Sequence, residues 1–247
     1  MTIRNISLRL QYDGSGFFGY QIQKDRRSVQ EELQKAVRKL TGETNRIIAA
    51  GRTDSGVHAN FQLVNFLTAS KIRPDKFSFH LKAYLPEDIL ILESKEEKKD
   101  FHARFSAKSK TYRYIISREK NMHPIYRKYR ENITYKLNLE KIKEGLEILR
   151  GEHDFKAFML NDKDDIINTR RTIDESYLIE SDKILEFVFK GDSFLHNQVR
   201  IMAGSLIELG REKITLEKFK SYLDKNNKYK AGPTLSPSGL YLDNIEY

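Results

Sequence analysis

The chain has 247 residues, of which 39% are hydrophobic and 32% are charged. This length and balance predict a globular protein with one large core or two fused domains. No apolar run reaches the roughly 20 residues of a membrane-spanning helix, and the first ten residues alternate polar and apolar side chains, unlike a signal peptide. We therefore expect a cytoplasmic protein without a membrane partner. Because the chain has no cysteine, disulfides, thiolate metal sites and a cysteine nucleophile are excluded.

The charge balance favours a polyanionic partner. Lysine and arginine number 44 against 35 aspartates and glutamates, which gives a net charge of +9. A basic surplus attracts nucleic acid, but many basic proteins bind none, so the charge alone does not assign a function.

Strands and helices are expected to alternate in the first hundred residues. A strand is predicted at 6–12, because Ile6, Leu8, Leu10 and Tyr12 share one face at a period of two. Ser28 and Glu31 predict a capping box at the start of a helix that ends before Gly42. Strands are also expected at 47–50, 59–67 and 89–92, and a second helix at 75–84. Residues 94–100 carry mixed charge without an apolar period, which predicts a solvated connection between two halves.

The second half repeats this alternation. Strands are expected near residues 111–117, 171–179, 184–190 and 239–245, and helices near 139–149, 196–209 and after Thr215. Gly151 and Gly210 lie where helix C-terminal caps commonly fall. The sequence thus predicts an α+β fold with helices on one face of a sheet and an open face for a ligand. Its two α/β halves are expected at 1–100 and 101–247.

The loop Gly51-Arg-Thr-Asp-Ser-Gly-Val-His58 is the most informative segment. Two glycines flank a polar core, and apolar strands are expected on both sides. Such a loop can hold the Asp54 carboxylate at the mouth of a cleft, and glycine permits backbone angles that other residues resist. From local sequence alone, an ordinary turn in which Asp54 bonds its own backbone is the commoner outcome.

Several motifs, in order, resemble the bacterial tRNA pseudouridine synthase A family. The first is Ala50-Gly-Arg-Thr-Asp-Ser-Gly-Val-His58, which is similar to the signature that contains the family's catalytic aspartate. The others are Tyr12-Asp-Gly14, Gly19-Tyr-Gln-Ile-Gln23, Phe101-His-Ala-Arg-Phe-Ser106, Tyr112-Arg-Tyr114, Gly151-Glu-His-Asp-Phe155, Phe194-Leu-His-Asn-Gln-Val-Arg-Ile-Met202 and Gly239-Leu-Tyr-Leu242. The similarity spans essentially the whole chain.

The resemblance implies an isomerase that converts uridine to pseudouridine at tRNA positions 38, 39 or 40, in the anticodon stem-loop. Asp54 would be the catalytic carboxylate, attacking the sugar or the base or removing the C2′ proton. Arg52 and Arg200 would hold charge or phosphate near it, Tyr112 would stack on the target uracil, and Leu240 would form an apolar wall. For Tyr114 the sequence leaves two roles open: an aromatic residue of the active site, or one that packs in the core.

The resemblance also implies a fold. Its two halves have RNA-recognition-like topology and form one continuous antiparallel sheet with a central RNA-binding cleft, in a homodimer. A stacked uridine must be extruded before it reacts, and phosphate contacts would make binding salt-dependent. Tyr126-Arg-Lys-Tyr-Arg130 and Arg170-Arg171 are candidates for the RNA-facing surface. No cofactor is expected, and the six scattered histidines predict no metal site. His58 either orients the Asp54 loop or is a structural residue at a strand start.

Three departures from the family pattern leave other functions open. Tyr20 stands where tryptophan is common, Ser55 stands for a common alanine, and residues 233–238 also differ. The alternatives are a diverged paralogue that modifies another tRNA or ribosomal RNA uridine, and a catalytically idle RNA-binding module. A phosphatase-like aspartyl nucleophile is disfavoured because the loop has no second acidic residue to hold magnesium.

Overall fold

Two units divide the chain. The computed structural model describes residues 2–160, 168–224, 227 and 229–247. Unit 1 contains residues 1–108 and 241–247, and unit 2 contains residues 109–240. Residues 101–108 and 241–247, which were expected in the second half, belong to unit 1: Lys108 N donates to Glu246 O at 2.8 Å, and the last strand pairs with the strand His58–Thr68 of this unit.

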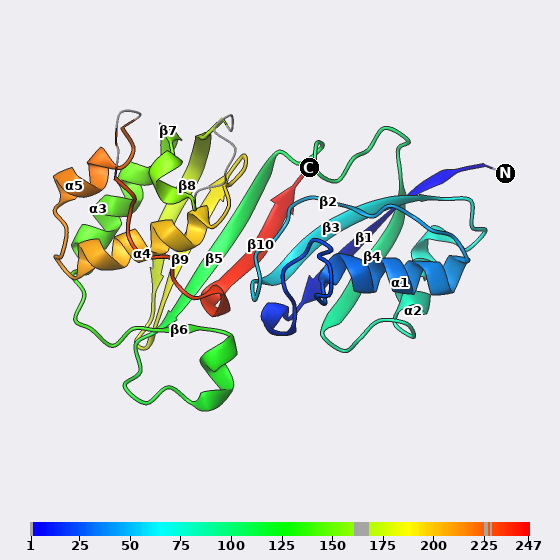
Figure 1. Cartoon of the computed structure of the whole chain (residues 1–247), viewed down its shortest axis with the longest axis horizontal. Helices are drawn as coiled ribbons and strands as arrows, with labels where there is room; N and C mark the ends of the chain where they lie inside the picture. The colour runs from blue at the N-terminus through cyan, green and yellow to red at the C-terminus, as the bar shows by residue number, and fades with distance from the viewer. Residues whose placement is uncertain (1, 161–167, 225–226, 228) are drawn as a thin grey trace. The chain divides into compact units, whose positions relative to one another are not determined.

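Unit 1 is a sheet with two helices (Figure 1). Its strands lie in the order β4-β1-β3-β10, and β2 pairs with β3. The elements are β1 (Arg4–Tyr12), α1 (Val29–Thr41), β2 (Ile48–Ala49), β3 (His58–Thr68), α2 (Phe77–Leu81), β4 (Ile89–Glu97) and β10 (Leu240–Glu246), with 3₁₀ turns at Gly14–Gly16 and Pro74–Lys76. The alternating residues Ile6, Leu8 and Leu10 of β1 are fully buried, as their period predicted.

Unit 2 is also a sheet with helices, and it has three α-helices among its described residues. Its strands lie in the order β5-β9-β8-β7, and β6 pairs with β5. The elements are β5 (Ser109–Ser117), β6 (Glu131–Asn132), α3 (Leu139–Leu149), β7 (Gly151–Asp154), β8 (Arg170–Glu180), β9 (Ile184–Gly191), α4 (Gln198–Gly210) and α5 (Leu216–Ser221), with 3₁₀ turns at Pro124–Lys128, Lys156–Phe158 and Pro237–Gly239. The three helices contact one another, and α3 packs on β8 (Figure 1).

The predicted α+β class is confirmed. The pairings of β1 with β3 and β4, and of β9 with β5 and β8, are antiparallel. Among the described strands, β10 pairs with β3 and β6 pairs with β5 in parallel. The strands are therefore mixed in direction, whereas the family resemblance implied an antiparallel sheet.

Two expected elements have different lengths in the structure. The strand expected at 89–92 continues to Glu97, because β1 pairs with it along residues 5–9. Its outward positions are charged, which hid the strand, while Ser94 is buried and accepts a hydrogen bond from Ser78 N at 2.9 Å. The helix expected at 75–84 is a 3₁₀ turn followed by the helix Phe77–Leu81 and then turns. Pro86 disfavours helical geometry at Leu85, the residue directly before it.

Helix ends also depart from the sequence rules. Gly42 is the left-handed cap predicted for α1, with φ +75°. Gly210 is instead the last residue of α4, and Arg211 is its cap. Gly210 packs closely on Ile142: a Cβ at 210 would lie 2.6 Å from Ile142 Cδ1, so the isoleucine side chain would have to shift.

A glycine in α4 supplies a test of packing in unit 2. Gly204 lies so close to the segment before β10 that a Cβ would meet Pro233 O at 1.9 Å. We expect Gly204→Ala to lower the free energy of unfolding by about 1–3 kcal/mol, because backbone must move to make room. Urea unfolding measures the change. Gly42→Asn is the control, because nothing lies within 4 Å of its Cβ position and asparagine tolerates the left-handed region. Equal stability of both variants would contradict this packing argument.

Candidate active-site loop

Asp54 lies in the loop that joins β2 to β3 in unit 1. Its side chain is half-buried, between exposed Arg52 and Ser55, while Thr53 is buried. The chain turns where Val57 N donates to Asp54 O at 3.2 Å, and Gly56 has φ +80°. Arg52 and Asp54 therefore stand on one short segment of the loop.

A buried hydrogen bond holds the loop from the side of β1. Tyr12 Oη and Thr53 Oγ1 lie 2.8 Å apart, both inside the protein. Burial raises the pKa of the Tyr12 phenol to about 12, so the hydroxyl keeps its proton at neutral pH. On β3, Gln62 Nε2 donates to Gly51 O at 2.8 Å. β1 and β3 thus both bond the residues immediately before Asp54, β1 at the Thr53 side chain and β3 at the Gly51 carbonyl.

The segment of residues 17–20 holds the loop from a second side. Tyr20 N donates to Thr53 O at 3.0 Å, and Gly56 N donates to Phe17 O at 3.2 Å. Gly19 has φ +91°, and a Cβ on it would lie 2.9 Å from Thr53 O. Glycine at this position therefore allows both the backbone angle and the close approach.

The same segment caps α1, which corrects the predicted capping box. No side-chain bond caps α1 from Ser28. Instead Val29 N donates to Gly19 O at 3.4 Å and Gln30 N donates to Tyr20 O at 2.9 Å. Glu31 forms an ion pair with Lys35 at 2.7 Å. Backbone carbonyls of the supporting segment thus satisfy the first amides of the helix, and α1 and the Asp54 loop share one support.

His58 closes the loop at the start of β3. It is buried, its Nδ1 accepts a hydrogen bond from Gly14 N at 3.0 Å, and its ring stacks on Tyr241 with centroids 4.8 Å apart. A Cβ on Gly14 would lie 2.0 Å from Val57 O, so only glycine fits there. His58 is therefore a structural residue that ties the loop to the end of β1 and to β10.

Tyr112 and Tyr114 lie on the same face of β5 in unit 2. Tyr112 packs edge-on against Phe194, with centroids 5.0 Å apart, and is 7% exposed. Tyr114 is fully buried, and its hydroxyl donates to Ser236 O at 2.8 Å and to Glu131 Oε2 at 3.1 Å. Burial raises the Tyr114 pKa above its ordinary value, and Glu131 adds to the effect. Tyr114 is thus a core residue.

Arg200 lies in the first turn of α4 and is anchored within unit 2. Its Nε donates to Leu235 O at 2.7 Å, and its Nη1 donates to Asn197 Oδ1. Asn197 precedes the helix in a left-handed conformation, with φ +59°, which asparagine tolerates. These two partners fix the direction of the guanidinium. Leu240 begins β10 and is 4% exposed.

The predicted site residues are therefore divided between the units. Arg52 and Asp54 share one loop of unit 1, whereas Tyr112, Arg200 and Leu240 belong to unit 2. Sequence reasoning missed the roles of Thr53, Tyr12 and Asn197. The sequence did contain two signals for these roles: the Thr53 hydroxyl beside Asp54, and Asn197 three residues before Arg200.

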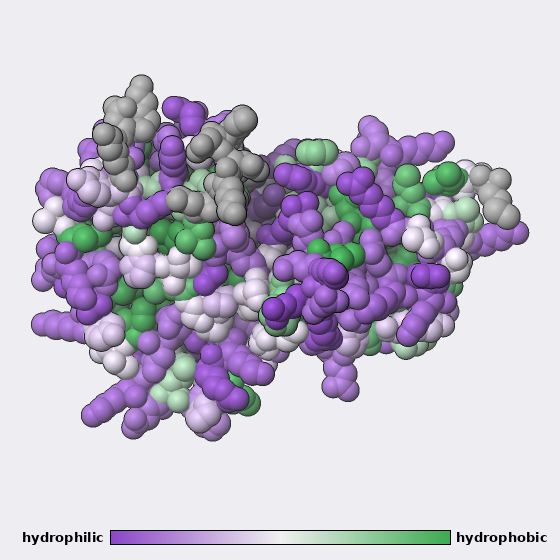
Figure 2. Space-filling view, viewed as in Figure 1, coloured by the Kyte–Doolittle hydropathy of each residue, from purple (hydrophilic) through white to green (hydrophobic). Residues whose placement is uncertain are grey.

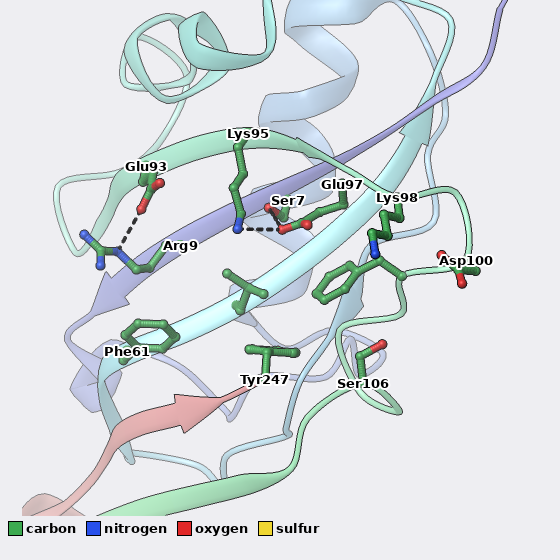
Figure 3. A pocket seen from close by; sticks show the side chains of 12 residues that line it. Ser7, Arg9, Phe61, Glu93, Lys95, Glu97, Lys98, Asp100, Ser106 and Tyr247 are labelled. Carbon is green, nitrogen blue, oxygen red and sulfur yellow. Dashed lines mark hydrogen bonds and ion pairs between the residues drawn. The ribbon is translucent and has the colours of Figure 1, made fainter.

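Unit 1 also contains a hollow of about 500 Å³ away from these residues (Figure 3). It lies on the side of β1 that carries Ser7 and Arg9, which alternate with the buried apolar residues. Four of its charged side chains form ion pairs, Arg9 with Glu93 at 3.6 Å and Lys95 with Glu97 at 3.2 Å. Phe61, Phe101 and Tyr247 supply aromatic lining. Within the described ranges, no cluster of three or more histidines and carboxylates could hold a metal ion.

Comparison with known proteins identifies the family. The family model described as tRNA pseudouridine synthase matches residues 10–106 and 146–247. Proteins named tRNA pseudouridine synthase A are similar over 245 residues, which is 99% of this chain and all of each relative: 42% identical in Finegoldia magna, 40% in Thermoanaerobacter pseudethanolicus and 39% in Clostridium acetobutylicum. In the parts of the chain that the structure describes, no helix has the length and apolar character to cross a membrane. The chain belongs to the tRNA pseudouridine synthase family.

Proposed function

We propose that this protein isomerises uridine to pseudouridine in tRNA, with Asp54 as the catalytic carboxylate. The observation that carries the proposal is the Asp54 loop, in which a half-buried carboxylate follows Thr53, whose side chain bonds β1 and whose backbone bonds the segment of residues 17–20. Rigid placement of this kind is what a carboxylate needs to meet one atom of a substrate. The family and the names of its relatives support the choice of reaction.

The reaction itself requires no cofactor. The bond from ribose C1′ to uracil N1 breaks, the base rotates, C1′ bonds to C5, and the proton on C5 leaves while N1 gains one. Asp54 acts on the sugar or the base. Arg52 and Arg200 hold the extruded nucleotide and its phosphates, Tyr112 stacks on the uracil, and Leu240 covers the base. The target uridines are those at tRNA positions 38 to 40, and the enzyme works as a cytoplasmic homodimer.

The visible surface is largely hydrophilic (Figure 2), and one turn of unit 2 has side chains that suit an anionic substrate. Figure 2 shows hydrophilic side chains over much of the visible surface of each unit. Tyr126 in the 3₁₀ turn after β5 lies under the Arg130 guanidinium, which is 4.1 Å from its ring centre. Such cation–aromatic pairs can stack on bases and meet phosphates, which supports this turn as part of the RNA-facing surface.

Replacing the carboxylate tests the chemistry. Asp54→Asn should reduce tritium release from [5-³H]uridine-labelled tRNA by roughly 10²- to 10⁴-fold, because the amide lacks the charge for general-base or nucleophilic work. Affinity for tRNA should persist. Ser55→Ala, in the same loop, is the control and should keep most of the activity. Tritium release that maps outside the anticodon arm would favour a paralogue that modifies another uridine. If the wild type binds tRNA tightly but releases no tritium, the catalytically idle RNA-binding module would be favoured.

The bond between Tyr12 and Thr53 makes a prediction about loop support. Tyr12→Phe should lower kcat about tenfold with little change in KM, because the buried Thr53 hydroxyl loses its partner. Tyr20→Phe is the matched control, since among the described residues no partner lies within hydrogen-bond distance of the buried Tyr20 hydroxyl. Steady-state tritium release on both variants measures the effect. Equal kcat values for Tyr12→Phe and the wild type would show that the bond does not position Asp54.

Phosphate contacts predict a strong dependence on salt. The dissociation constant for tRNA, measured by filter binding with Asp54→Asn, should rise at least about tenfold between about 50 and 200 mM salt. Binding releases condensed cations from the phosphates, and added salt makes this release less favourable. A chain with net charge +9 has the cations for such contacts. An affinity that stays flat across this range would contradict phosphate-dominated binding.

A further inference from the structure

An exposed aromatic side chain stands on the turn of residues 102–106 in unit 1, which we call the Phe105 turn. Phe105 is 76% exposed, more than any other large hydrophobic side chain among the described residues. Leaving a phenylalanine in water forgoes the free energy of burying it. A single exposed hydrophobic residue is common, so the surroundings of the ring decide whether it has a function.

The Phe105 turn is fixed by its own hydrogen bonds. Ser106 N donates to His102 O at 2.9 Å, and His102 N donates to Ser106 Oγ at 3.1 Å. His102 Nδ1 accepts from the amides of Arg104 and Phe105 at 3.2 and 3.3 Å. The imidazole therefore has a set direction, and it stacks on the Phe105 ring with centroids 4.3 Å apart and planes 30° apart. The ring is exposed and yet oriented.

Two buried asparagines anchor the turn in unit 1. Asn5 Nδ2 donates to Lys98 O at 3.0 Å and to Phe101 O at 2.9 Å. Asn65 Oδ1 accepts from Ala103 N at 2.9 Å, and the two side-chain amides bond each other at 2.8 Å. Polar groups buried in this way hold the chain that they bond, because leaving them unpaired is costly. Tyr247 Oη adds a bond to Ala103 O at 2.9 Å.

The charge around the ring is positive. The Arg104 guanidinium is 5.6 Å from the Phe105 ring centre. Residues 98–108 contain four lysines and arginines against one aspartate, a surplus of three positive charges. An oriented aromatic ring with a neighbouring arginine offers a stacking surface to a base and a charge to its phosphate.

We propose that the Phe105 turn is a stacking platform for a nucleobase of the bound tRNA, separate from the pocket for the target uridine. The inference rests on the proposed function, since tRNA is the substrate that supplies the base. Phe101 and Ser106 from this segment also line the hollow of unit 1 (Figure 3). In this arrangement the base stacks on the Phe105 ring, and Arg104, whose guanidinium is 5.6 Å from the ring centre, meets the adjoining phosphate.

Substitution of Phe105 tests the platform. Phe105→Ala should raise both KM for tRNA and the dissociation constant about tenfold, with kcat unchanged, because the residue binds RNA without touching the reacting atoms. Phe105→Trp should restore the affinity. Phe79→Ala is the matched control: Phe79 is 70% exposed and also neighbours a histidine ring, and among described residues no cation lies over it. This control should bind as the wild type does.

The outcomes separate the platform from the proposed function. No tritium release by the wild type would overturn the proposed function, and filter binding of Phe105→Ala would still test the platform. Unchanged KM and dissociation constant in Phe105→Ala, with an active wild type, would overturn the platform alone. A change in oligomeric state on gel filtration with unchanged RNA affinity would also overturn it, because the ring would then contact protein. Thermal unfolding of Phe105→Ala should match the wild type, which shows that the change is not a folding defect.

Discussion

The hydrogen bond between Tyr12 and Thr53 is the constraint on which the Asp54 loop depends. It joins the last residue of β1 to the residue before the carboxylate, and burial keeps the phenol protonated as the pKa rises to about 12. Thr53 O accepts from Tyr20 N as well, so one residue connects the loop to a strand and to the support of α1. A loop with two such attachments keeps one conformation, and Asp54 inherits that rigidity.

The sequence predicted the apolar part of the fold well. Ile6, Leu8 and Leu10 indicated β1 because their period of two reports burial on one face, and Gly42 indicated the end of α1 because glycine suits a left-handed cap. The second half of β4 was missed, since its charged side chains hide the alternation. Ser28 was misleading because the bonds that cap α1 come from backbone carbonyls, which have no sequence signature.

The candidate site was predictable only in part, for a related reason. Motif resemblance pointed to Asp54, and the structure shows how Gly14 and Gly19 allow its loop to pack closely. Contacts between distant segments, such as Tyr12 with Thr53, depend on register and loop path. Local sequence does not specify these. Neither reading of Tyr114 could be preferred until its hydroxyl was seen to bond Ser236 and Glu131.

Unit 1 uses one device twice, and this links the Asp54 loop to the Phe105 turn. In each case buried polar side chains on β1 and β3 bond an adjoining loop: Tyr12 bonds the Thr53 side chain and Gln62 the Gly51 carbonyl of one loop, and Asn5 and Asn65 bond the backbone of the other. Buried polar groups lower stability unless each is paired, so their partners must stay in place for the sheet to be stable. The Asp54 loop and the Phe105 turn, which adjoin different ends of the same strands, are thereby held as rigidly as the core of the sheet. The proposed role of Asp54, a carboxylate that reaches one atom, requires that rigidity, and so does the proposed role of Phe105 in receiving one base.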